Sequence, residues 1–400
     1  MTETVVVTGL GVVSPLNPEG DLEGFWTSLC AGETAVAKVR SFDASSYPCQ
    51  VAAEVDRERL GTYGPEEEPA LRMARVAFTQ AIAHADIVLE AYVPRRVGLV
   101  VGTVLGGTVC GERYLRAGGG RGGVMAEGLE HYPLRTVAAH LARQTGCAGP
   151  VMTVSTACAS GTDALGIAYR RIAAGLADVI VAGGVDAVCE LAFSGFCALR
   201  ALTADKVRPF SRNRTGLALG EGAAFLVLES ERTAAARGAR VLGRIAGYAS
   251  RADAFHLTAP HREGRGLAAA AAAALQDAGC PADDIDYVSA HGTGTPYNDA
   301  METFALKAAL GGHAHRVPIS SIKGALGHPF GAAGAIEAGT CLLAMRDRIV
   351  PPTANLEEAD PACDLDFVPN RARCVGVRTA LSLSAGFGGQ NAALLIRGGA

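Results

Sequence analysis

Apolar runs alternate along the chain with segments of helical periodicity, and this alternation indicates an α/β protein. Short runs typical of buried strands occur at residues 97–101, 178–184 and 223–229. Apolar residues at intervals of three and four predict a helix through Leu71 and Phe78. Strands and helices in alternation imply sheets covered by helices on both faces.

The same patterns predict most of the remaining elements. We expect further strands at residues 4–8, 151–155, 285–290, 317–322 and 381–384. We expect further helices at residues 25–29, 137–143, 163–172, 267–279 and 333–345. Glycines suggest a tight turn at residues 9–11 and a surface excursion at 106–128, and residues 186–222 look irregular.

The second part of the chain repeats the first in outline. Residues 71–103 read as helix, linker, strand and Gly-Thr, and residues 267–293 follow the same order. The strand, glycine-rich turn and helix of residues 151–172 return at 317–345. The sequence therefore predicts two duplicated halves, and we place them at residues 1–230 and 231–400.

Composition narrows the functional classes. The chain is 49% hydrophobic and 19% charged, with a net charge of −4, so nothing favours nucleic acid or an anionic membrane as partner. Apolar stretches are too short for a transmembrane span, and the N-terminus leads directly into a strand without a signal peptide. The eleven cysteines include no C-x-x-C pair, so we expect reduced thiols in the cytoplasm.

The segment VSTACASGTDALG places Cys158 between a predicted strand and a predicted helix. The start of a helix favours an anion, so this position should lower the thiol pKa from about 8.5 and produce a nucleophile. Ala157, Ala159 and Gly161 leave room for a substrate to approach. A buried structural cysteine among small residues explains this segment equally well.

Two histidines favour the catalytic interpretation. His291 in HGTGTPYND and His328 in KGALGHPFGAAG each follow a predicted buried strand within a glycine-rich turn. In open α/β sheets, ligands bind beyond the carboxyl ends of the strands, and Cys158 has that position too. One such histidine is commonly structural, but three strand-end groups of this kind indicate an active site.

TACASG, HGTGTPYND, KGALGHPFGAAG and GFGG occur in this order, and together they resemble the β-ketoacyl synthases, closest to the synthase II type. The resemblance covers nearly the whole chain. It implies the five-layered αβαβα thiolase-like fold, built from two duplicated halves: the first carries the nucleophilic cysteine and the second the two catalytic histidines. It also implies decarboxylative condensation of an acyl chain with a malonyl thioester, in fatty acid or type II polyketide or polyene synthesis.

The resemblance assigns a role to each site residue. Cys158 would carry the acyl chain, and His291 and His328 would bind the malonyl thioester oxygen. Backbone N–H groups of Cys158 and Phe387 would hold the new oxyanion, and Phe387 would gate the extender. The supporting residues are expected to be Lys323 with its partner Glu337, Thr293, Thr295, Phe196 and Gly388, with Asp299 and Glu302 supporting the His291 loop.

The same resemblance implies partners. Substrates would arrive on the phosphopantetheine of an acyl carrier protein, with no separate cofactor and no metal. The enzyme would be a dimer through the strand at 151–155, either with itself or with a chain-length-factor homologue.

Three positions depart from the family pattern. Leu217 and Ala218 replace a frequent aromatic, and Gly294 replaces a frequent serine. Residues 66–68, all glutamate, stand where an acidic carrier usually meets basic residues, and like charges would oppose docking. Other basic residues could then dock the carrier: Arg72, Arg75, Lys206 or Arg208. These departures favour a secondary pathway over housekeeping fatty acid synthesis.

Two other functions remain to be weighed. A chain-length-factor-like partner subunit typically lacks the nucleophile, whereas Cys158 and both histidines are present here. A Cys-His hydrolase needs one base and an acidic orienting group, so the second histidine together with Lys323 argues against it.

Overall fold

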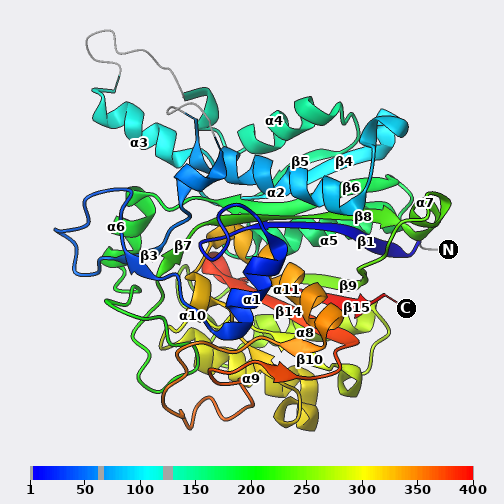
Figure 1. The fold of residues 1–400 in the computed structure, drawn as a ribbon. Coiled ribbons are helices and arrows are strands. Elements are labelled where there is room, and N and C mark those ends of the chain that lie inside the picture. Colours follow the sequence, from blue (N-terminus) through cyan, green and yellow to red (C-terminus); the bar gives the residue numbers. More distant parts are fainter. Residues whose placement is uncertain (1–2, 62–66, 120–128, 400) are drawn as a thin grey trace.

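A computed structural model describes residues 3–61, 67–119 and 129–399 and contains one large mixed sheet (Figure 1). Its ten strands lie in the order β11 (Ile319–Ser320), β10 (Tyr287–Ser289), β14 (Thr379–Gly386), β15 (Gln390–Gly398), β9 (Gly243–Ala252), β1 (Val5–Val13), β8 (Gly222–Ser230), β6 (Val179–Asp186), β4 (Val97–Gly102) and β5 (Val151–Val154).

The strand order is symmetric about the junction of β9 and β1. Moving outward from β1, the successive pairings are antiparallel, antiparallel, parallel and parallel, and the same series is met moving outward from β9. The two central strands pair through only three residues each. The molecule thus has two five-stranded halves of identical topology. The boundary between residues 230 and 231 stays a prediction, supported by the end of β8 at Ser230.

Helices divide the molecule into five layers (Figure 1). Between the two halves of the sheet lie α5 (Ser160–Ala173) and α11 (Ala333–Asp347), which pack against strands of both. The outer face of the first half is covered by α2 (Pro69–Ala85) and α4 (Thr136–Thr145). The outer face of the second half is covered by α8 (Arg265–Asp277) and α9 (Asn298–Leu310). The predicted αβαβα architecture is confirmed.

Strand β1 corrects the prediction of a turn at residues 9–11. All nine residues of β1 are buried, and the strand continues through both glycines, with a shift in its pairing to β8 between Val7 and Gly9. A Cβ on Gly11 would lie 2.0 Å from the carbonyl oxygen of Ala77 in α2. The glycines therefore serve close packing of α2 on the sheet.

Two helices lie where the sequence indicated irregular chain. Part of the predicted surface excursion is α3 (Thr108–Arg116), while residues 120–128 lie outside the described residues. Within residues 186–222 lies α6 (Glu190–Ala198). Strands β9 and β15 and helix α9 also had no sequence prediction.

The smaller elements complete the chain. They are α1 (Leu22–Ala31), α7 (Glu231–Ala236) and α10 (Lys323–Leu326), a three-stranded sheet of β2 (Ala37–Lys38), β3 (Val51–Ala53) and β7 (Leu219–Gly220), and the pair β12 (Ile349–Val350) and β13 (Arg373–Cys374). Across the described residues, no helix has both the length and the apolar character needed to cross a membrane.

Two of the three glutamates at residues 66–68 are described, and both have partners within the protein. Glu67 forms an ion pair with Arg75. Glu68 is buried and accepts the backbone N–H of Cys110, and burial raises its pKa. Glu66 lies outside the described residues. The two described glutamates are thus occupied within the protein, which removes most of the expected charge repulsion.

Candidate active site

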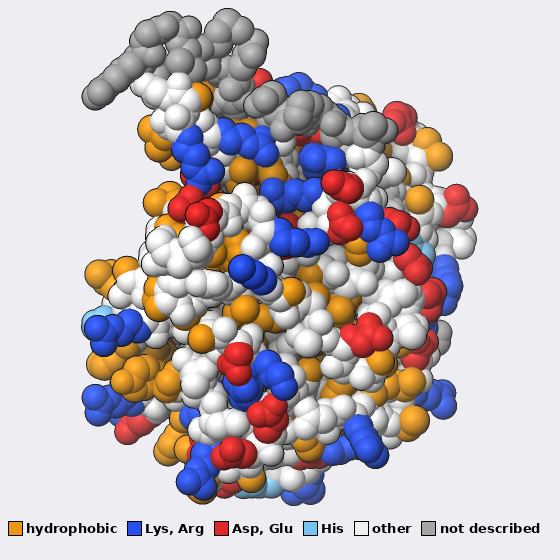
Figure 2. Space-filling view, turned by 60° about the vertical axis from the view of Figure 1, so that its left-hand side comes forward, with side chains coloured by type: hydrophobic (Ala, Val, Ile, Leu, Met, Phe, Trp, Pro, Cys, Tyr) orange, Lys and Arg blue, Asp and Glu red, His pale blue; other side chains and the backbone are white. Residues whose placement is uncertain are grey.

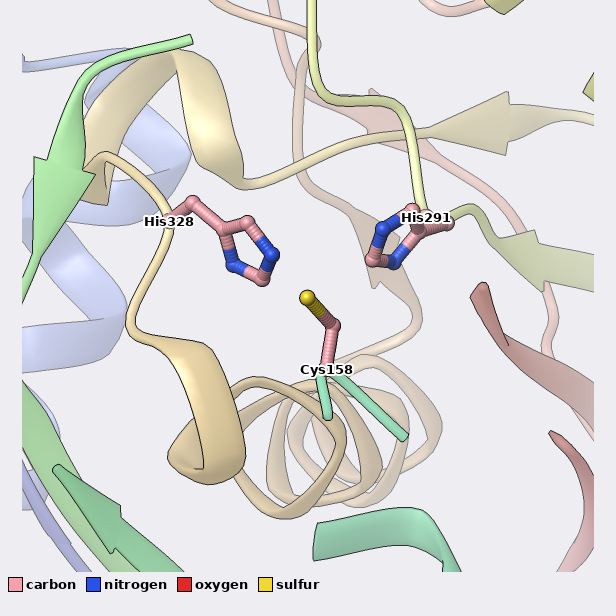
Figure 3. A group of neighbouring side chains, drawn as sticks. All are labelled: Cys158, His291 and His328. Carbon is pink, nitrogen blue, oxygen red and sulfur yellow. The ribbon is translucent and has the colours of Figure 1, made fainter. Parts of the chain in front are cut away.

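Three reactive side chains meet at the carboxyl ends of parallel strands. Cys158 follows β5, His291 follows β10, and His328 lies after β11 and α10. The thiol sulfur and one nitrogen from each histidine all lie within 4.8 Å of one another. The two imidazole rings are 5.3 Å apart and nearly perpendicular. Figure 3 shows the three side chains pointing toward one another from separate segments, as the sequence predicted.

A strained turn holds Cys158. The preceding Ala157 has a φ of 51°, in the left-handed region that alanine rarely adopts. The backbone N–H of Thr156 donates to Ser160 Oγ at 2.9 Å, and the same hydroxyl donates to the carbonyl of Ala157 at 2.6 Å. The first turn of α5 thus fixes the turn that presents the thiol.

The predicted lowering of the Cys158 thiol pKa is wrong for this arrangement. Burial raises the pKa of Cys158 to about 11, although Lys323 and the backbone N–H groups of Phe387 and Cys158 act in the opposite direction. Desolvation disfavours the thiolate more strongly than these groups and the helix start favour it. Cys158 is therefore a protonated thiol at neutral pH in the free protein.

The end of β14 completes the nucleophile's surroundings. A Cβ on Gly386 would lie only 3.0 Å from the backbone nitrogen of Cys158 and 3.1 Å from the Cβ of Ala157. Glycine therefore lets β14 reach the turn and bring the next N–H, that of Phe387, toward the sulfur. Two backbone donors from different halves of the molecule converge here, which is the arrangement of an oxyanion hole.

Buried carboxylates hold the His291 loop. Glu302 accepts the backbone N–H groups of His291 at 2.6 Å and Gly292 at 2.7 Å. Asp299 accepts those of Thr293 and Gly294. The predicted supporting role of both acids is confirmed. Gly294 has a φ of 75°, so the serine that is frequent at this position would be strained here.

A buried ion pair lies behind the histidines. Lys323 and Glu337 are each 1% exposed and in direct contact, as predicted. The Lys323 ammonium also lies 3.5 Å from His291 Nδ1. Because an ammonium only donates, this contact makes Nδ1 the acceptor and leaves the hydrogen on Nε2.

Both imidazoles are neutral at physiological pH. Burial, and then the charge of Lys323, hold the pKa values of His291 and His328 well below the usual value. Neither ring nitrogen of His328 has a hydrogen-bond partner among the described residues. The site therefore offers uncharged N–H donors with nothing yet to bind, which suits an oxygen that gains negative charge.

The same three side chains have the residue types of a metal site. A metal would need the lone pair of His291 Nε2, which the contact with Lys323 protonates. It would also place a second cation near the buried ammonium. These residues fit an anion better than a metal ion.

A cavity of about 260 Å³ lies over Cys158. Of the sequence-predicted residues, seven line it: Cys158, His291, His328, Thr293, Thr295, Phe196 and Phe387. Lys323 and Glu337 lie behind it. Gly388 is not among the lining residues, and its N–H donates to the carbonyl of Leu257, so its place in the binding site stays a prediction. Leu217, one of the departures from the family pattern, lines the cavity, whereas the carbonyl of Ala218 accepts the N–H of His328.

Several lining residues had no sequence prediction. Phe330 also had no prediction; it is not among the lining residues, but its ring stacks on that of His328. Of the predicted residues, Phe196 stacks on Phe387 with centroids 5.4 Å apart. Phe330 stands inside the histidine motif, so its position could have signalled a role. Tyr297 likewise stands inside the HGTGTPYND motif, whereas the others come from segments without a motif: Leu199, Arg200, Ala201, Thr258, Ala259 and Pro260.

Comparison with known proteins agrees with this geometry. Residues 2–234 match the model of the β-ketoacyl synthase N-terminal domain, and residues 242–357 match that of the C-terminal domain. The chain belongs to the β-ketoacyl synthase family.

Individual relatives cover the whole chain. It is 42% identical to a putative polyketide beta-ketoacyl synthase 1 of Streptomyces halstedii, over 100% of this chain and 99% of the relative. It is 37% identical to the 3-oxoacyl-[acyl-carrier-protein] synthase 2 of a Synechocystis strain, over 98% and 97%. Among solved structures, the ishigamide ketosynthase/chain length factor matches with a TM-score of 0.93 and 35% identity over 100% of both chains.

The raised thiol pKa gives a prediction about labelling. At pH 7, iodoacetamide should modify the exposed Cys374 before Cys158. Between pH 7 and 9, labelling of Cys158 should rise about tenfold per pH unit, because the thiolate fraction grows in that proportion below the pKa. Peptide mapping measures both rates, with the buried Cys341 as an unreactive control. Labelling of Cys158 ahead of Cys374 at pH 7 would contradict the raised pKa.

The buried ion pair gives a prediction about stability. Glu337→Gln should lower the free energy of unfolding by about 3–5 kcal/mol, because it leaves Lys323 charged and uncompensated in the interior. Lys323→Met combined with Glu337→Leu should recover most of this loss. Removing the exposed pair partner Lys206, which contacts Glu357, should cost about 0–1 kcal/mol. Urea unfolding measures all three, and a double variant no more stable than Glu337→Gln would refute the argument.

Proposed function

We propose that the protein joins an acyl group held on Cys158 to a malonyl thioester, with loss of CO₂. The observation that carries this proposal is the convergence of one thiol with two neutral imidazole N–H donors, within 4.8 Å, in a largely apolar cavity. A thiol alone would transfer an acyl group. The two donors add a site for an enolate oxygen, which a simple acyl transfer or hydrolysis does not need.

Loading is the first half of the reaction. The sulfur of Cys158 attacks the carbonyl of an incoming acyl thioester, and the carbonyl oxygen takes the negative charge. The N–H groups of Cys158 and Phe387 are placed to hold that oxygen. The bond to the carrier sulfur then breaks, and the thiol proton leaves with the released carrier thiol. Starting from a protonated Cys158 is therefore compatible with the chemistry.

Condensation is the second half. The malonyl thioester oxygen accepts hydrogen bonds from His291 and His328, the carbon–carbon bond to the carboxylate breaks, and CO₂ leaves. The remaining enolate carbon attacks the acyl carbonyl on Cys158 and forms the new carbon–carbon bond. Cys158 departs as a thiolate near Lys323, whose charge favours it, and regains a proton. Neutral donors are well suited because the charge that they stabilise appears only during the reaction.

The mouth of the cavity fits a substrate tethered to a carrier protein. Leu199, Arg200 and Tyr297 line the cavity and are exposed. The sequence had suggested four other docking residues, and each has partners within the protein. Lys206 and Arg208 contact Glu357, Arg75 contacts Glu67, and Arg72 donates to the backbone carbonyls of Arg57 and Gly61. On the face drawn in Figure 2, acidic side chains lie among the basic ones. A similar structure is described as a type II polyketide acyl-carrier protein in complex with its ketosynthase.

We place the reaction in a type II polyketide or polyene pathway. Two relatives are each 40% identical over 98% of this chain: a tetracenomycin polyketide synthase ketoacyl synthase alpha subunit of Streptomyces glaucescens and an actinorhodin polyketide putative beta-ketoacyl synthase 1 of Streptomyces coelicolor. All eleven cysteines are free thiols, which is compatible with the cytoplasm.

A second subunit would pair through β5. This strand ends the sheet, its outer edge is unpaired in the described chain, and Val151 is 41% exposed. Solved relatives are described as ketosynthases with a chain length factor. Because Cys158 and both histidines are in place, this chain is the catalytic member of such a pair rather than the factor.

The proposal predicts that decarboxylation can be separated from condensation. Cys158→Gln should form no β-ketoacyl product but should still release CO₂ from a malonyl-carrier thioester, because both histidines remain. Adding His328→Ala should lower that release a hundredfold or more, since losing one such donor costs about 3 kcal/mol. CO₂ is measured against a no-enzyme control. Background release from the single variant, or equal release from both, would refute the role of the histidine pair.

The position of Arg200 at the cavity mouth predicts that its substitution impairs only the reaction of carrier-bound substrates. Arg200→Glu should lower kcat/KM for acyl-carrier protein by about tenfold, since like charge opposes an acidic carrier. It should leave turnover of a small pantetheine thioester unchanged. Arg95→Glu is the matched control, because Arg95 is exposed and precedes β4, at the strand ends opposite the cavity. Equal losses with both substrates would place Arg200 in the chemistry and not in docking.

A further inference from the structure

One buried carboxylate joins the nucleophile's turn to the other half of the molecule. Asp163, in the first turn of α5, is 3% exposed. Thr156 Oγ1 donates to one of its oxygens at 2.6 Å, and the hydroxyl of Tyr248 donates to the other at 2.8 Å. Thr156 lies two residues before Cys158, whereas Tyr248 lies on β9 in the second half. The Asp163 carboxylate therefore accepts hydrogen bonds from both halves of the molecule.

The turn that Asp163 holds is one that needs support. Ala157, between Thr156 and Cys158, has a left-handed backbone, which costs free energy for a residue other than glycine. Such a conformation persists only where its surroundings fix it. Ser160 fixes the turn from within α5, whereas Asp163 connects the Thr156 side chain to Tyr248 on β9.

The position of this turn relative to the second half matters for chemistry. The two oxyanion-hole donors come from different halves: the Cys158 N–H from the turn, and the Phe387 N–H from the end of β14. Their spacing depends on how the halves are held together near the site. A second contact of this kind, between the hydroxyls of Thr162 and Ser384 at 2.8 Å, joins α5 to β14 itself.

We propose that Asp163 is a positioning residue that sets the spacing of the two oxyanion-hole donors. This inference rests on the condensing function proposed above. On this inference, Asp163 influences the acyl-transfer steps and not the decarboxylation. The enolate site is held separately, since Glu302 and Lys323 position His291 from within the second half.

Loss of Asp163 should therefore affect the two half-reactions differently. Misplacing a donor by a fraction of an ångström weakens oxyanion binding, so loading of Cys158 should slow about tenfold to a hundredfold. Decarboxylation should change by less than about twofold, because the hole is not used in that step. A general loss of structure would lower both rates together.

The test compares Asp163→Ala with Asp163→Asn, which keeps the shape and can still bond both hydroxyls. Thr156→Val removes only the hydroxyl that contacts Asp163, and it carries the same test if Asp163→Ala does not fold. Asp277→Ala is the matched control, because Asp277 accepts the backbone N–H of Tyr248 and pairs with Arg170 without touching the turn. Loading is followed by intact mass with an acyl-carrier thioester. CO₂ release is followed in the same variants carrying Cys158→Ala.

The expected result is slow loading in Asp163→Ala and Thr156→Val, near-normal loading in Asp163→Asn and Asp277→Ala, and unchanged CO₂ release throughout. Normal loading in Asp163→Ala and Thr156→Val would overturn the inference, and so would parallel loss of loading and CO₂ release. If the unsubstituted protein itself fails to load, the proposed function fails instead, so the two failures are distinguishable.

Discussion

The close approach of α5 and α11 between the two halves of the large sheet is the constraint on which the site depends. A Cβ on Gly161 would lie 2.6 Å from the carbonyl oxygen of Gly331, and one on Gly334 would lie 1.9 Å from Thr162 Oγ1. Only glycine allows the two helices to begin this near each other. Their starts carry the Cys158 turn and the His328 segment, so contact between the duplicated halves also assembles the reactive groups.

Burial then determines the charge state of what is assembled. It raises the thiol pKa and lowers both imidazole pKa values, so the three reacting groups are neutral before substrate binds. The nearby Lys323 is compensated by Glu337. The negative charge that develops on substrate oxygens during the reaction consequently meets N–H donors that are already in place, and little reorganisation is needed at that moment.

Local sequence was enough to predict that Cys158, His291 and His328 lie at strand ends, because each follows a short apolar run within a turn of small residues. It could not predict the thiol pKa, because desolvation depends on residues distant in sequence that enclose the sulfur. The acidic run before α2 was misleading for the same reason: Glu68 is buried beside Cys110. Helix α6 has no clear periodicity, and its place is set by packing of Phe193.

The most direct test of the account is the mass of the protein itself during one turnover. Incubation with an acyl-carrier thioester should add one acyl group, and peptide mapping should place it on Cys158. Adding malonyl-carrier protein should remove that group and yield a β-ketoacyl thioester two carbons longer on the carrier. An acyl group that is released as free acid, or that remains on Cys158 after malonyl-carrier protein is added, would contradict the account.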